Sequence, residues 1–197
     1  FRALQNRLVA IDTAGWAASK KVDWQIIDAE MNGYDFNRRI LKPWERDPAF
    51  YQTVWMYQSD VPAHEGPTNH ALLEYWQYAF PLKGEAKEKL LVELELIPPF
   101  LQQAKENLNG NARDLWVAGI NDIRDQGKNL KTIEEQLHNK NNVDKELLIA
   151  VEKAQAENNT FVSWLEEQAP DKTGPSGIGK DNYTWYQNKV HRVPLTW

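Results

Sequence analysis

The residues best suited to bind a metal are His64, Glu65 and His70, which fall within one short stretch. In zinc peptidases of the helical type, two histidines stand one turn apart so that both reach one ion, and a glutamate lies beside the bound water. Here the spacing is longer, and Gly66 and Pro67 would break the helix that must aim the ligands. We therefore predict a loop without a metal site.

A second stretch, Gly174 to Lys180 (G-P-S-G-I-G-K), follows the phosphate-loop pattern G-x-x-x-x-G-K-[S/T] up to its last position. Asp181 replaces the hydroxyl that holds magnesium and would add negative charge beside the phosphates. Pro175 removes one amide, and the segment before the loop has the periodicity of a helix, not of a buried strand. These departures argue against nucleotide binding, and we predict a hinge ahead of a short helix.

Three aromatic residues follow this hinge. Tyr183, Trp185 and Tyr186 fall in a short segment of helical spacing. Aromatic side chains can form the wall of a binding cleft, but they also dock helices onto their neighbours. Both interpretations stay open, and we assign no residue a catalytic or metal-binding role.

Tryptophan is frequent, with nine residues in a chain of 197. Trp24, Trp116, Trp164 and Trp185 each lie within a helical pattern, so we expect such rings to fill a core. The alternative is a ligand surface on which sugar rings stack against exposed indoles.

The composition excludes several functional classes. A net charge of −5 and a pI near 5.5 leave no basic stripe that could neutralise several phosphates, so nucleic acid is a poor partner. The absence of cysteine excludes disulfides and thiolate metal sites without choosing between cytosol and periplasm. No apolar run approaches the roughly 18 residues of a membrane span.

The elements that must position these residues are helices. Apolar residues recur at three- and four-residue steps, and nowhere do two alternating runs flank a tight turn, so we predict an all-α fold of about seven helices. The stripes over 116–137 and 143–165 predict a long antiparallel helical hairpin. Within 85–108, Pro98-Pro99 predicts a kinked helix or two helices that meet at an elbow. Shorter helices are expected over 47–57 and 69–80.

The stretch 22–55 is the densest in apolar and aromatic residues. Val22, Ile26 and Phe36 lie on a stripe of helical spacing that we expect to be buried. Gly33 within it should permit the close approach of another backbone, or a local bend.

Three segments resemble the N-terminal part of the bacterial domain of unknown function 885 family. They lie in the same order and are spread over most of the chain: E-M-N-G-Y-D-F-N-R-R-I-L-K-P-W-E-R-D-P-A-F-Y (30–51), S-D-V-P-A-H-E-G-P (59–67) and G-P-S-G-I-G-K-D-N-Y-T-W-Y-Q-N-K-V-H-R-V-P-L-T-W (174–197). The resemblance implies a larger, mostly helical protein, often exported or lipid-anchored, that is grouped with zinc metallopeptidases. The family's metal-binding helix, of the form H-E-x-x-P-G-H-H, lies further downstream, and this chain contains no residue of it.

From this resemblance we expect the N-terminal helical portion of a zinc-dependent, peptidase-like hydrolase, which forms part of a substrate cleft wall without the metal site. The resemblance also implies that the segment after the hinge lies close to the catalytic half, which makes Tyr183, Trp185 and Tyr186 the candidates for contacts with a substrate. The chain opens with Phe1 and has only Met31 and Met56, so we expect a piece of something longer. The expected organisation is a helical domain over 1–169, then a hinge and short aromatic helix over 170–197 that lead into a missing C-terminal part.

That missing part is the expected partner, together with a peptide substrate. Zinc would belong to the full-length protein and no cofactor to this chain, and the resemblance implies a periplasmic or lipid-anchored location in the cell envelope. The alternative is a stand-alone, non-catalytic helical module that binds a peptide or a glycan.

Overall fold

The computed structural model describes residues 1–58, 71–138 and 144–197. Its contacts divide the chain into two compact units, each described by itself here. Unit 1 combines Phe1–Lys42 with Gly177–Trp197, and unit 2 is Pro43–Ser176. These units do not coincide with the expected division after residue 169, because the segment from 177 onward groups with the first 42 residues.

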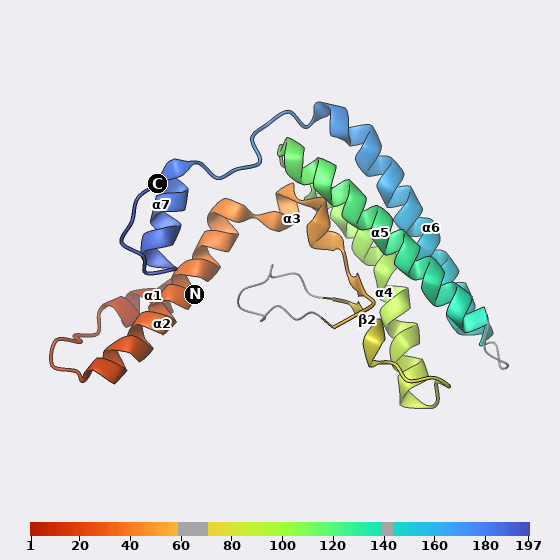
Figure 1. Ribbon diagram of the computed structural model, residues 1–197, viewed down its shortest axis with the longest axis horizontal. Helices are drawn as coiled ribbons and strands as arrows, with labels where there is room; N and C mark the ends of the chain where they lie inside the picture. The colour runs from red at the N-terminus through yellow and green to blue at the C-terminus, as the bar shows by residue number, and fades with distance from the viewer. Residues whose placement is uncertain (59–70, 139–143) are drawn as a thin grey trace. The chain divides into compact units, whose positions relative to one another are not determined.

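Helices dominate both units (Figure 1), as the all-α prediction requires. Unit 1 contains α1 (Arg2–Val9), α2 (Ala18–Phe36), the π-helical segment η1 (Asn37–Leu41) and α7 (Lys180–Lys189). Unit 2 contains α3 (Pro43–Arg46), η2 (Pro48–Tyr51), β1 (Val54–Trp55), β2 (Leu73–Glu74), η3 (Tyr75–Gln77), α4 (Glu85–Asn107), α5 (Arg113–His138), α6 (Lys145–Gln168) and η4 (Ala169–Asp171). None of the helices among the described residues is long and apolar enough to cross a bilayer.

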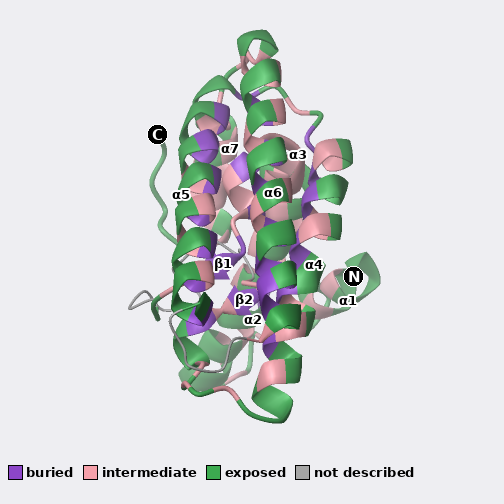
Figure 2. Ribbon diagram, turned by 90° about the vertical axis from the view of Figure 1, so that its right-hand side faces the viewer, coloured by how far each residue is buried: buried purple, intermediate pink, exposed green. Residues whose placement is uncertain are grey.

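The core of unit 2 lies between α4, α5 and α6, and the buried positions line the sides that face one another (Figure 2). The antiparallel hairpin is confirmed, because Arg124 of α5 pairs with Glu166 near the end of α6, while Glu134 approaches Glu152 nearer its start. Each fully buried leucine or isoleucine contributes about 1.5–3 kcal/mol. These apolar positions include Leu90, Leu94, Ile97, Leu101, Ile123, Leu130, Ile133 and Leu165.

α4 runs without interruption through Pro98 and Pro99, so the segment is one helix and not two. Of the two predicted forms, the elbow between separate helices is therefore wrong. A kink at the two prolines stays a prediction.

Two segments predicted to be helical have other structures. The segment after Asp47 forms only the 3₁₀ turn η2, and β1 then pairs in parallel with β2 through Val54 and Leu73. The buried side chain of Gln126 explains the change: its Oε1 accepts hydrogen bonds from the amides of Thr53, at 2.6 Å, and Val54, at 3.1 Å. A helix would have turned both amides toward its own carbonyl groups.

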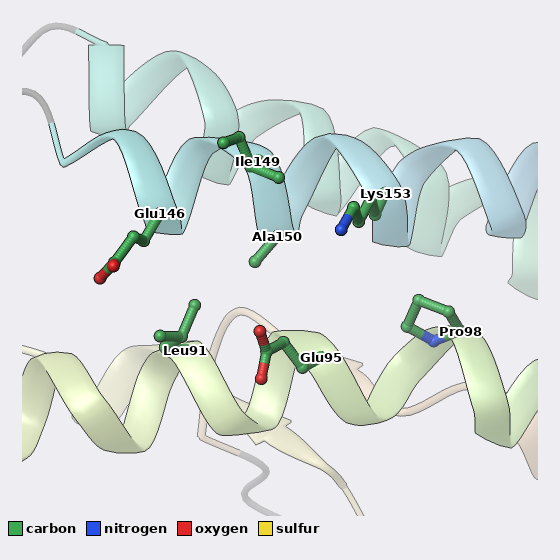
Figure 3. Close-up of a pocket in the computed structure, with 7 residues that line it drawn as sticks. All are labelled: Leu91, Glu95, Pro98, Glu146, Ile149, Ala150 and Lys153. Carbon is green, nitrogen blue, oxygen red and sulfur yellow. The ribbon is translucent and has the colours of Figure 1, made fainter.

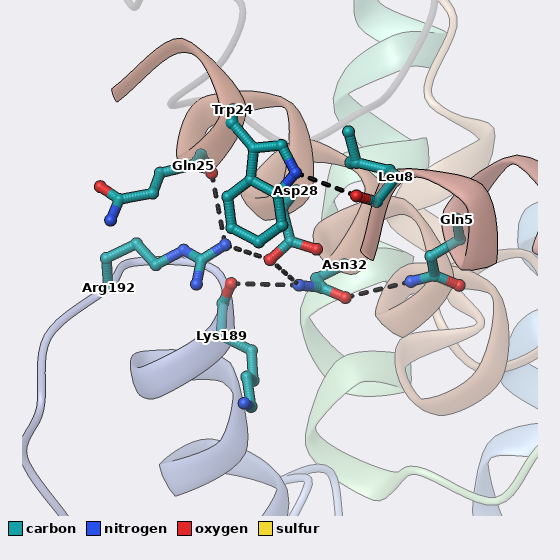
Figure 4. A network of polar contacts seen from close by, with 8 residues as sticks. All are labelled: Gln5, Leu8, Trp24, Gln25, Asp28, Asn32, Lys189 and Arg192. Atoms are coloured by element: carbon teal, nitrogen blue, oxygen red, sulfur yellow. Dashed lines mark hydrogen bonds and ion pairs between the residues drawn. The ribbon is translucent and has the colours of Figure 1, made fainter. Parts of the chain in front are cut away.

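The predicted buried stripe of α2 is wrong for its first half. The exposed fractions of Val22, Ile26 and Ile27 are 51%, 57% and 51%, and only Phe36 of the stripe is buried. α2 instead directs Trp24, Asp28 and Asn32 toward its neighbours in unit 1 (Figure 4). Periodicity identified the helix, but it could not tell that the polar side would face inward.

Polar contacts hold the helices of unit 1 together (Figure 4). Asn32 Oδ1 accepts a hydrogen bond from Gln5 of α1 at 3.0 Å, and its amide group donates to Asp28 at 3.1 Å. Asp28, whose side chain is 9% exposed, forms an ion pair with Arg192 just after α7. Loss of one partner from a buried ion pair is strongly destabilising. Gly33 accommodates a side chain and not a backbone, because a Cβ there would lie 3.4 Å from Val190.

Candidate functional site

The histidine-containing stretch with His64, Glu65 and His70 lies outside the described residues, and so does most of the predicted loop around it. Another group does bring possible ligand atoms within 4.8 Å of one another: Glu134 and His138 on α5 with Glu152 on α6. His138 and Glu152 are exposed, and His138 Nε2 lies 3.8 Å from Glu134 as in an ordinary surface pair.

The first three residues of the stretch that follows the phosphate-loop pattern stabilise the fold of unit 2. Ser176 Oγ accepts hydrogen bonds from the amides of Asp114, at 2.7 Å, and Leu115, at 3.3 Å, and so caps the N-terminus of α5. The carbonyl oxygens of Pro175 and Ser176 accept from the guanidinium of Arg46 at 3.1 and 3.0 Å. The loop therefore presents hydrogen-bond acceptors to Arg46 and to the N-terminus of α5, whereas a phosphate loop presents amide donors to its ligand.

Lys172 closes the same corner of unit 2. Its ammonium donates to the carbonyl of Gly110 at 3.0 Å and lies 4.2 Å from the centre of the Trp116 ring. Burial lowers the pKa of Lys172, with Asp171 opposing that effect. Trp116 is fully buried and contacts Trp164, so two of the predicted core tryptophans do fill the core. The cation–π contact stabilises this corner by about 1 kcal/mol.

A buried polar network crosses the helical hairpin. The amide group of Gln126 donates to Asn158 Oδ1 at 2.9 Å, and Asn158 donates in turn to the carbonyl of Ile123 at 3.0 Å. Both side chains are fully buried. Asn158 falls on the same stripe of helical spacing as Val151 and Leu165, and a polar residue among these apolar positions was the signal in the sequence for an inward partner.

A shallow hollow of about 390 Å³ lies between α4 and α6 (Figure 3). Leu91 and Glu95 of α4 stand opposite Ile149, Ala150 and Lys153 of α6. Its walls are two well-packed helices, and the side chains that line it include charges of both signs. We assign it no ligand.

The three aromatic candidates on α7 separate into two groups. Trp185 stacks on Phe36 with ring centres 5.4 Å apart and planes 11° apart, and Tyr186 packs against the same ring at 4.9 Å. These two side chains dock α7 onto α2, as the alternative interpretation expects. Tyr183 turns the other way and meets Trp197 edge-on, with ring centres 5.4 Å apart.

The segment after α7 folds back along the helix and forms the candidate site. The amide of Trp197 donates to Thr184 Oγ1 at 3.1 Å, and Asn188 donates to the carbonyl of Leu195 at 3.1 Å. An open hollow of about 650 Å³ results, within the size range of small-molecule sites. It is lined by Lys180, Asp181, Thr184, Trp185, Asn188, Lys189, Thr196 and Trp197.

Of the predicted site residues, Trp185 therefore lines the hollow, and Tyr183 contacts the ring of Trp197, which also lines it. Sequence reasoning missed Trp197 and Thr184. Trp197 follows Pro194 to Thr196 and lies on no stripe of helical spacing. It reaches α7 only because the chain folds back along that helix. Comparison with family models, with curated proteins and with solved structures gives no match.

Proposed function

We propose that this chain is a non-catalytic helical portion of a zinc-dependent, peptidase-like hydrolase, whose ion would be held by polypeptide other than these residues. The resemblance of segments 30–51, 59–67 and 174–197 suggests the family. In such an enzyme a zinc ion polarises the scissile carbonyl and activates water. Neither step is assigned to a residue of this chain.

The observation that carries the proposal is the exposed apolar surface of unit 1. Val22, Ile26 and Ile27 on α2 are half-exposed or more, as are Leu4 and Val9 on α1, at 58% and 60%. Phe36 is the one fully buried apolar side chain of unit 1. A surface of this kind is typical of one that other polypeptide covers. The missing C-terminal part of the enzyme is the proposed cover, and a peptide is the proposed substrate.

The proposal includes a location in the cell envelope, periplasmic or lipid-anchored, which rests on the resemblance alone. The test uses the longer protein encoded with this chain. We expect bound zinc by elemental analysis and hydrolysis of peptide or amide substrates that a chelator abolishes. A longer protein that holds no zinc and cleaves no such substrate would refute the proposal.

An experiment that introduces charges tests the exposed apolar surface of α2 separately. Val22→Glu with Ile26→Glu should prevent this chain from associating with the separately expressed C-terminal part. The matched control is Gln25→Glu, which adds a charge on the neighbouring face of the same helix. Equal association of all three proteins, measured by analytical ultracentrifugation, would show that this surface is not the contact.

The second candidate function is a helical binding module without chemistry. It is favoured by the hollow beside α7, where an exposed tryptophan is held against polar side chains. In that case the ligand contacts would come from this chain alone, with no need of further polypeptide.

A further inference from the structure

We infer that the hollow beside α7 binds a neutral sugar ring, with Trp197 as the surface on which the ring stacks. The inference rests on the second candidate function and is independent of any hydrolase activity. It follows from the way the indole is held, from the free donors and acceptors around it, and from their charges.

The Trp197 ring is both exposed and fixed. Its exposed fraction is 69%, although its backbone amide is anchored on Thr184 and its ring is supported edge-on by Tyr183. The ammonium of Lys180 lies 5.6 Å from the ring centre. A large apolar ring held in this way stays exposed to water. The CH groups of a pyranose would cover it, and the burial of apolar area would favour binding.

The side chains around the indole offer unused donors and acceptors. In unit 1, which is described in full, no hydrogen-bond or ion-pair partner engages the carboxylate of Asp181 or the ammonium of Lys189. Thr184 accepts a bond at its oxygen, so its hydroxyl hydrogen remains available. The amide nitrogen of Asn188 is occupied by the carbonyls of Thr184 and Leu195, which leaves its oxygen as an acceptor.

This inventory selects a ligand whose polar groups both donate and accept. A sugar hydroxyl does both, so the hydroxyls of neighbouring rings of an oligosaccharide could meet Asp181 in the first turn of α7 and Asn188 and Lys189 about two turns further along. A carboxylate ion could pair with Lys180 or Lys189, but it has no donor to offer Asp181 and would bring a like charge toward that carboxylate. An apolar peptide side chain would cover the indole but would make no hydrogen bond to these polar groups.

The experiment titrates the whole 197-residue chain with four probes: cellotetraose and tetra-N-acetylchitotetraose as neutral sugars, tetragalacturonate as an acidic sugar, and tetra-alanine as a peptide. Binding is measured by isothermal titration calorimetry and by saturation-transfer NMR. We expect at least one neutral tetrasaccharide to bind with a millimolar or lower Kd. Saturation transfer should be strongest to the CH protons of one ring face.

Two variants locate the binding. Trp197→Ala and Asp181→Ala should each weaken it about tenfold, the loss of one stacking contact or one charged hydrogen bond. The control Trp76→Ala removes another exposed tryptophan, 39% accessible and part of unit 2, and should leave the affinity unchanged. Circular dichroism establishes that each variant is folded.

The possible outcomes are distinct. Neutral sugars that fail to bind, or that bind Trp197→Ala as well as the unaltered chain, overturn the inference. Binding of tetra-alanine or tetragalacturonate alone, sensitive to Trp197→Ala, overturns the assignment to a neutral sugar but leaves the binding module in place. A chain that binds none of the four probes contradicts both, and the hydrolase proposal is then judged by its own zinc experiment.

Discussion

The buried network between α5 and α6 allows a stability prediction to be worked out group by group. Replacing Asn158 by leucine keeps the branched shape and the number of heavy atoms of this fully buried side chain but removes its polar atoms. The amide group of Gln126 then loses its acceptor at 2.9 Å and becomes a buried donor without a partner. That orphaned donor costs about 1–3 kcal/mol, and the lost bond to the carbonyl of Ile123 about 1 kcal/mol more.

The added apolar surface of leucine offsets about 1 kcal/mol of this loss. We therefore expect Asn158→Leu to lower the free energy of unfolding by about 1–3 kcal/mol in urea titrations followed by tryptophan fluorescence. The matched control is Asn159→Leu at the next position, which is exposed and should change the value by no more than about 0.5 kcal/mol.

A double-mutant cycle makes the reasoning refutable. Gln126→Leu alone should cost more than Asn158→Leu, because it leaves the amides of Thr53 and Val54 without their acceptor. In that background Asn158→Leu should cost little, because the donor that it would orphan is already gone. If Asn158→Leu costs the same with or without Gln126, or no more than Asn159→Leu, the network does not stabilise the fold as described.

Three further changes test other contacts, each by the free energy of unfolding. Ser176→Ala should cost about 0.5–2 kcal/mol because the N-terminus of α5 loses its cap, whereas Ser176→Thr should retain most of that stability; equal losses would contradict the capping role. Gly119→Ala should cost about 1–3 kcal/mol, because a Cβ there would lie 2.7 Å from the amide nitrogen of Ala49. The control Gly15→Ala has open space around it and should be tolerated. The pKa of Asp144 is lowered, mainly by the hydrogen bond from Lys87. This carboxylate therefore contributes stability above its unfolded pKa of about 3.9. The contribution is lost as the pH falls through the lower folded pKa. The stability difference between the unaltered chain and Asp144→Asn should therefore shrink as the pH falls below about 4, and a difference independent of pH would refute the assignment.

The long helices could be predicted from the sequence because each has its own uninterrupted period. The stripe through Ile120, Ile123 and Leu130 determines both the helix and its buried side, and the structure agrees at each position. The short segments could not be predicted in the same way. Whether the chain near Val54 becomes helix or strand depends on Gln126, 72 residues further along the chain. The spacing of residues around Val54 cannot predict so distant a contact.

Unit 1 shows a different limit. The apolar stripe of α2 was recognised correctly as helical, but a period does not reveal which side is covered when little of the surface is buried. The side that carries Asp28 faces inward because Arg192 is brought to it from the far end of the chain. The same fold-back explains the candidate site, where Trp185 was foreseen from its helix and Trp197 was not.

The assembly of unit 1 from both ends of the chain determines the order of events on the ribosome. α4, α5 and α6 can pack as soon as unit 2 has been translated, while α1 and α2 wait through all of that synthesis with Asp28 uncompensated. Only when Arg192 leaves the exit tunnel can α2 acquire this partner. The helices of unit 1 that are made before unit 2 thus complete their contacts after it, and during that interval they are open to chaperones and proteases.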